Sequence, residues 1–142
     1  MKKAHILLVE DNEGDIFLTK EALEESKITN KISVLKNGSD VMDFLKKTER
    51  FPYAQTPDLI LLDLNLPKKN GLEVLLEIKE SEAFKMIPVV MLTTSSSEED
   101  IVESYKRKVN CFITKPVDAE SFLKVILATE NFWVQIVTLP KP

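Results

Sequence analysis

The 142-residue sequence has little cysteine, glycine or histidine. Its single cysteine, Cys111, cannot form an internal disulfide bond, which is compatible with a reducing compartment. One histidine and one cysteine are too few for a zinc site of the usual kind. The three glycines, Gly14, Gly38 and Gly71, complete neither a GxxxxGK[ST] loop nor a GxGxxG motif, which excludes the two common nucleotide-binding loops.

Long apolar runs and an excess of positive charge are also missing. No segment approaches the roughly 20 apolar residues of a membrane helix. The N-terminal apolar run 6–9 ends at Glu10, too soon for a secretory signal peptide. The formal net charge is -4, whereas nucleic-acid binding by bulk electrostatics needs a basic surface. We therefore expect one cytoplasmic globular domain with no direct contact to nucleic acid or membrane.

Short apolar runs alternate with amphipathic stretches along the chain. Wholly apolar runs such as 6–9 are typical of strands that are covered on both faces. The stretches between them carry apolar residues at helical spacing. The expected strands are 6–9, 31–36, 58–63, 88–92 and 111–114, and the expected helices begin near residues 13, 39, 72, 97 and 118. This alternation predicts right-handed βαβ crossovers, and so a doubly wound α/β fold with a parallel sheet between two layers of helices.

Polar residues end or directly follow four of these strands. In a doubly wound sheet, ligands bind beyond those ends, where the strand order reverses. The residues are Glu10 and Asp11, Asp63, Thr93 and Thr94, and Thr114 with Lys115. We expect three carboxylates, a hydroxyl group and an ammonium group to meet at this edge of the sheet.

This set of side chains suits a divalent ion and a phosphoryl group. Clustered carboxylates repel one another unless a cation is present. Oxygen ligands favour Mg2+ (or Mn2+), which also binds phosphate oxygens. The expected protein ligands are Asp11 and Asp63 directly, Glu10 through a water and Asn65 through its backbone carbonyl. The other oxygen of Asp63 could then attack phosphorus in line, with Lys115 and Thr93 stabilising the charge on the phosphoryl oxygens.

Four segments resemble, in this order, the response-regulator receiver family of two-component systems: 9–12, 58–67, 92–95 and 114–116. The resemblance covers nearly the whole chain at the expected spacings. It implies a flavodoxin-like sheet of strand order 2-1-3-4-5. It also implies that Asp63 is the phosphoacceptor for the phosphohistidine of a sensor histidine kinase. The switch residues would be Thr93 and Phe112, and the peptide bond before Pro116 would be cis.

Within that family, the sequence is most similar to the small regulators that partner phytochromes. The loop 48–57, the segment 64–71 and the ending 132–140 carry this likeness. The resemblance implies a phytochrome as the kinase and makes a homodimer plausible. Residues 1–133 would form the receiver domain. The apolar tail 134–142 could fold back onto the domain or contact a second chain, and both interpretations stay open.

The main interpretation is a signalling switch that is not an enzyme, and two alternative functions stand beside it. Haloacid-dehalogenase-type phosphatases also use an Asp nucleophile, Mg2+ and a lysine, but they need a second Asp two residues after the first. Asn65 stands there and cannot transfer a proton. A phosphorylation-independent adaptor is disfavoured because carboxylates without a metal are costly to keep. Among single residues, Phe112 is expected in ordinary core packing and His5 at the surface or a strand edge.

Overall fold

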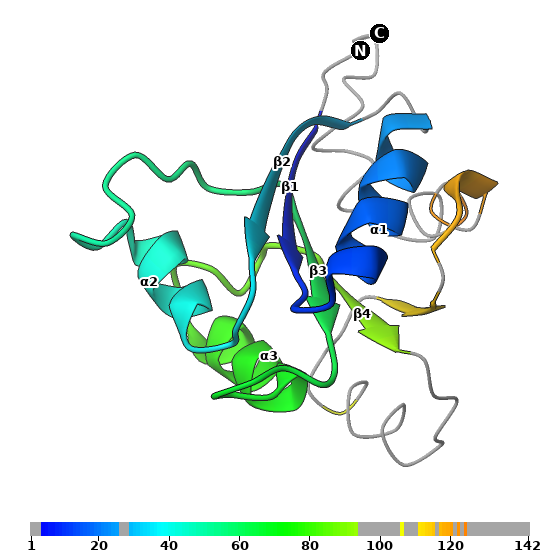
Figure 1. Ribbon diagram of the computed structural model, residues 1–142. Coiled ribbons are helices and arrows are strands. Elements are labelled where there is room, and N and C mark those ends of the chain that lie inside the picture. The colour runs from blue at the N-terminus through cyan, green and yellow to red at the C-terminus, as the bar shows by residue number, and fades with distance from the viewer. Residues whose placement is uncertain are drawn as a thin grey trace, which may run out of the picture.

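The computed structural model describes residues 4–25, 29–93, 106, 111–115, 117–120, 122 and 124. These residues contain a five-stranded parallel sheet of order β2-β1-β3-β4-β5 (Figure 1). The strands are β1 (Ala4–Val9), β2 (Thr29–Leu35), β3 (Leu59–Asp63), β4 (Val89–Thr93) and β5 (Cys111–Thr114). The helices with assigned bounds are α1 (Glu13–Glu25), α2 (Asp40–Lys46) and α3 (Gly71–Glu80). The strand order and the parallel pairing confirm the predicted fold class.

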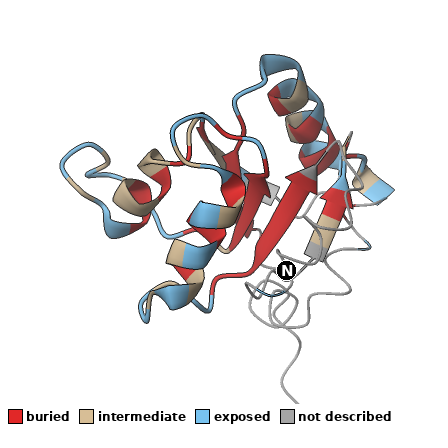
Figure 2. Ribbon diagram, turned by 90° about the horizontal axis from the view of Figure 1, so that it is seen from below, coloured by how far each residue is buried: buried red, intermediate tan, exposed pale blue. Residues whose placement is uncertain are grey.

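The helices cover both faces of the sheet, with α1 on one side and α2 and α3 on the other (Figure 1). Successive side chains of a strand point to opposite faces, so β1 serves two cores at once. Ile6 and Leu8 belong to the core under α1, whereas Leu7 and Val9 belong to the core under α2 and α3. Every residue of β1 and β3 is buried, as the red strands of Figure 2 show. Burial on both faces explains why the runs 6–9 and 59–62 within these strands are wholly apolar.

The strand boundaries differ from the prediction by one or two residues. β2 begins at Thr29, two residues earlier than expected, and β3 begins after Asp58. The carboxylate of Asp58 accepts a hydrogen bond from the His5 backbone N–H at 2.8 Å. The Asp58 N–H also donates to the His5 carbonyl at 2.8 Å, so this residue joins the start of β3 to β1. At the chain's last described helical residues, the Phe122 N–H donates to the Asp118 carbonyl at 3.0 Å, as expected for a helix that begins near 118.

Several predictions fall outside the described residues. These are the helix expected from residue 97, the cis peptide bond before Pro116, and the tail 134–142. The described part of the chain contains no helix long and apolar enough to cross a membrane.

The expectation for His5 was wrong, because its side chain is buried within the sheet. Its Nε2 lies 2.9 Å from Ser33 Oγ on β2, and its Nδ1 lies 3.4 Å from the Thr56 carbonyl oxygen. The loop 48–57 therefore covers this end of β1. Burial lowers the pKa of His5 below its ordinary value, since the charged imidazolium would lose water.

Candidate functional site

Strand register brings the predicted acidic residues to one edge of the sheet. Val9 lies beside Leu62 in the β1–β3 pair, so Glu10 and Asp63 come at the same level of neighbouring strands. Oxygens of the Glu10, Asp11 and Asp63 carboxylates all lie within 4.8 Å of one another. Glu10 and Asp63 are buried, whereas Asp11 is exposed. The sequence placed these three side chains together correctly, because parallel strands end at a common edge.

Lys115 comes directly after β5 and reaches into this acidic group. Its Nζ pairs with Glu10 Oε1 and lies 3.2 Å from Asp63 Oδ1. The lysine side chain is only 7% exposed, and those of Glu10 and Asp63 are 0% and 6% exposed. A buried ammonium group between two buried carboxylates stabilises charges that would otherwise be costly to keep from water.

Burial disfavours the charged form of both Glu10 and Lys115. Burial raises the pKa of the Glu10 carboxyl and the Asp63 charge adds to the rise, while the Lys115 ammonium partly opposes it. Two backbone N–H groups, of Asp11 and Asn12, also donate to Glu10 Oε2 at 3.1 and 3.3 Å. Burial alone would lower the pKa of Lys115, but the surrounding carboxylates raise it above its ordinary value. The lysine is therefore charged at neutral pH.

The donor atoms of the site fit a hard divalent cation. Three carboxylates lie close together and offer only oxygen, which suits Mg2+ or Mn2+ and does not suit a thiophilic metal. Asn65 lies two residues beyond Asp63 in the turn after β3 and is exposed. Its role as a backbone ligand stays a prediction.

Two glycines hold the loop that follows Asp63, a role that their positions in the sequence did not reveal. The Gly71 N–H donates to the Leu64 carbonyl at 2.9 Å, and a Cβ on Gly71 would lie 2.4 Å from the Asp63 carbonyl oxygen. A Cβ on Gly38 would lie 1.9 Å from the Lys69 carbonyl oxygen. These close approaches clamp the loop against β3 and the turn after β2.

The two predicted switch residues are described to different extents. Thr93 is the last residue of β4 and pairs with Thr114 in the backbone register, but its side chain lies outside the described residues, as does Thr94. Phe112 is half-buried in β5 and packs against the core under α2 and α3. Its place agrees with the expected core packing.

Asp15 is a member of the site that sequence reasoning missed. Its Oδ2 lies 3.1 Å from Lys115 Nζ, although the two residues are 100 positions apart in the chain. The first turn of α1 folds back over the end of β1 and brings this carboxylate to the lysine. No local pattern signals this contact, because it depends on how α1 packs on the sheet.

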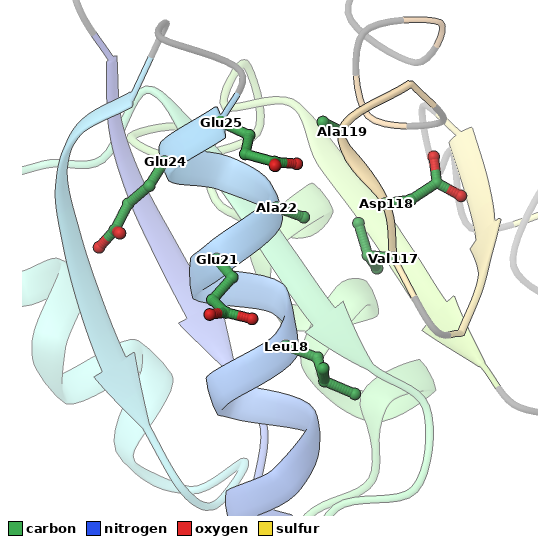
Figure 3. Close-up of a pocket in the computed structure, with 8 residues that line it drawn as sticks. All are labelled: Leu18, Glu21, Ala22, Glu24, Glu25, Val117, Asp118 and Ala119. Carbon is green, nitrogen blue, oxygen red and sulfur yellow. The ribbon is translucent and has the colours of Figure 1, made fainter.

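A cavity of about 560 Å3 lies between α1 and the segment after β5 (Figure 3). Its lining is partly acidic and partly apolar: Leu18, Glu21, Ala22, Glu24, Glu25, Val117, Asp118 and Ala119. The acidic cluster lies at the N-terminal end of α1, whereas the cavity follows the later turns of that helix.

Known proteins with the same sequence pattern share this architecture. Residues 6–127 match the response regulator receiver domain. Response regulator Rcp1 of Synechocystis sp. is 46% identical over 135 residues, which are 95% of this chain and 92% of Rcp1. The crystal structure of Mn2+-bound Rcp1 has a TM-score of 0.77 at 45% identity and covers 97% of this chain and 99% of that one. The crystal structure of the phosphorylated cyanobacterial phytochrome response regulator RcpA has a TM-score of 0.79 at 45% identity, and the match covers 98% of this chain and 99% of RcpA.

Proposed function

This chain belongs to the response-regulator receiver family of signalling proteins, and from that premise we propose that Asp63 accepts a phosphoryl group from the phosphohistidine of a sensor histidine kinase. The placement of Lys115 Nζ, 3.2 Å from the buried Asp63 carboxylate and paired with Glu10, supports the proposal most directly. The haloacid-dehalogenase alternative gains no support, because Asn65 stands where those phosphatases need an acid.

The transfer follows from what each group can do. One carboxylate oxygen of Asp63 forms a bond to phosphorus while the N–P bond of the phosphohistidine breaks, and the electron pair of that bond returns to the imidazole nitrogen. Lys115 stabilises the negative charge on the phosphoryl oxygens from its position beside Asp63. The product is an aspartyl phosphate on the rim of the sheet.

Glu10, Asp11 and Asp63 would hold the divalent ion, with the backbone carbonyl of Asn65 as a further ligand. When bound, Mg2+ or Mn2+ supplies positive charge that offsets both the clustered carboxylates and the incoming phosphoryl oxygens. The oxygen-only donor set and the Mn2+-bound form of the relative Rcp1 support this part of the proposal.

The output is a change in the surface that the domain offers to a protein partner. The new charge on Asp63 would draw the hydroxyl of Thr93, and Phe112 would move with it. The likeness to RcpA, a phytochrome response regulator, supports a phytochrome as the kinase. A cytoplasmic location is part of the proposal, because a histidine kinase needs ATP to form its phosphohistidine. The domain boundary at residue 133, the role of the tail and a homodimer stay predictions.

A phosphotransfer profile tests the proposal. Radiolabelled histidine kinases, phytochrome kinases among them, are mixed with the wild-type chain and with Asp63→Asn. We expect rapid transfer from at least one kinase to the wild type and none to the variant. Transfer to Asp63→Asn at the wild-type rate would overturn the assignment of the phosphoacceptor.

A further inference from the structure

Lys115 is surrounded by more carboxylates than the phosphoacceptor site requires. Its Nζ contacts Glu10, lies 3.2 Å from Asp63 Oδ1 and lies 3.1 Å from Asp15 Oδ2. An ammonium group can donate at most three hydrogen bonds, and three carboxylates already lie within ion-pair distance of this one. A phosphoryl group on Asp63 brings further oxygens to the same ammonium, and these compete with the carboxylates that already pair with it.

Asp15 differs from the other two carboxylates in ways that make it the exchangeable partner. Its side chain is 30% exposed, whereas that of Glu10 is fully buried. Asp15 also stands apart from the acidic group Glu10, Asp11 and Asp63 that fits a divalent ion. Water can solvate Asp15 after it leaves the lysine, whereas removal of the ammonium from the fully buried Glu10 is more costly.

We propose that Asp15 is a positioning residue that competes with the phosphoryl group on Asp63 for the ammonium of Lys115, and that it thereby restrains phosphorylation. This inference rests on the proposed function. The Asp15 backbone N–H is held by Asn12 Oδ1 at 2.9 Å, which fixes the first turn of α1 and keeps the carboxylate within reach of the lysine. The same negative charge repels the incoming phosphoryl oxygens.

The test uses Asp15→Asn, which removes the charge and keeps the shape of the side chain. We expect labelling by acetyl phosphate in Mg2+ to be about two- to fivefold faster than in the wild type, as the loss of one partly exposed ion pair implies. Beryllofluoride, which mimics the phosphoryl group, should bind tighter by a similar factor. Asp15→Glu restores the charge, so its rate should return toward the wild-type rate.

Glu13→Gln is the matched control, because it removes a carboxylate from the same helical turn. Glu13 pairs with Lys36 and both side chains are exposed, so it competes for no group of the site. We expect Glu13→Gln to leave the labelling rate and the beryllofluoride affinity at their wild-type values. Equal acceleration by Glu13→Gln, or failure of Asp15→Glu to restore the rate, would overturn the inference, since each would separate the effect from the contact with Lys115.

The outcomes distinguish this inference from the function on which it rests. If the wild type takes no label from acetyl phosphate and binds no beryllofluoride, the proposed function fails. If the wild type is labelled but Asp15→Asn is no faster and binds beryllofluoride no tighter, the function stands and the role of Asp15 is refuted.

Discussion

Replacing Gly71 by alanine tests whether the loop after Asp63 is held by close backbone contact. A Cβ on Gly71 would lie 2.4 Å from the Asp63 carbonyl oxygen, 2.9 Å from Leu64 Cα and 3.0 Å from Met91 Cε. Two of these three atoms belong to the backbone, so the clash cannot be relieved by turning a side chain. Forcing one methyl group into a packed site costs about 1–3 kcal/mol. We expect Gly71→Ala to lower the free energy of unfolding by about that amount, measured by urea titration.

Gly14 offers a matched control, because it also lies in the first turn of a helix. A Cβ on Gly14 would lie 3.3 Å from the side-chain oxygen of Asn12, a contact that a movement of a few tenths of an ångström relieves. Since alanine is favoured over glycine in a helix by roughly 0.5–1 kcal/mol, Gly14→Ala should be neutral or stabilising by up to about 1 kcal/mol. In Gly71→Ala, the clash should also displace the backbone at Asp63 and slow labelling by acetyl phosphate. Gly14→Ala should leave the labelling rate unchanged. Equal stability of the two variants would refute the reasoning.

Three further predictions concern charge. Lys115→Ala leaves Glu10 and Asp63 buried without their ammonium, so urea titration without divalent ions should show the free energy of unfolding lowered by about 3 kcal/mol. Mg2+ should restore part of that free energy. The variant should still take some phosphoryl label, but without the conformational response. Mg2+ at about a hundredfold its dissociation constant should stabilise the wild type by about 2.7 kcal/mol, and a gain of the same size in Asp11→Asn at that concentration would count against Asp11 as a ligand. The pKa of His5 is lower in the folded chain than the ordinary 6.5, so the unfolded chain takes up the proton first as the pH falls. The contribution of His5 to the free energy of unfolding is therefore present above pH 6.5 and is lost as the pH drops through the folded pKa. The free energy of unfolding of His5→Gln, measured in urea, should depend less steeply on pH in that range.

The sheet and the acidic cluster could be predicted because both follow from local patterns. An apolar run such as 6–9 is typical of a strand that is covered on both faces, and β1 is buried in that way. Once the strands are parallel, their carboxyl ends share an edge. The meeting of Glu10, Asp63 and Lys115 then needs no knowledge of side-chain packing, only of where each strand stops.

The remaining features depend on contacts between distant segments, which no local pattern records. Asp15 meets Lys115 across 100 positions, at a distance set by how α1 packs on the sheet. Gly38 and Gly71 are required by backbone approach to the loop after Asp63, and that approach exists only in the folded chain. His5 was misplaced because the loop 48–57, which covers it through the Thr56 carbonyl, is polar and gave no sign of where it packs.

The chemical identity of the modified residue is the most direct test of the central claim. The wild-type chain is labelled with acetyl phosphate in Mg2+, the acyl phosphate is trapped by borohydride reduction, and the peptides are identified by mass spectrometry. We expect the reduced residue at position 63 and no reduced residue in Asp63→Asn. A trapped acyl phosphate on another carboxylate of the wild type, with Asp63 unmodified, would contradict the account.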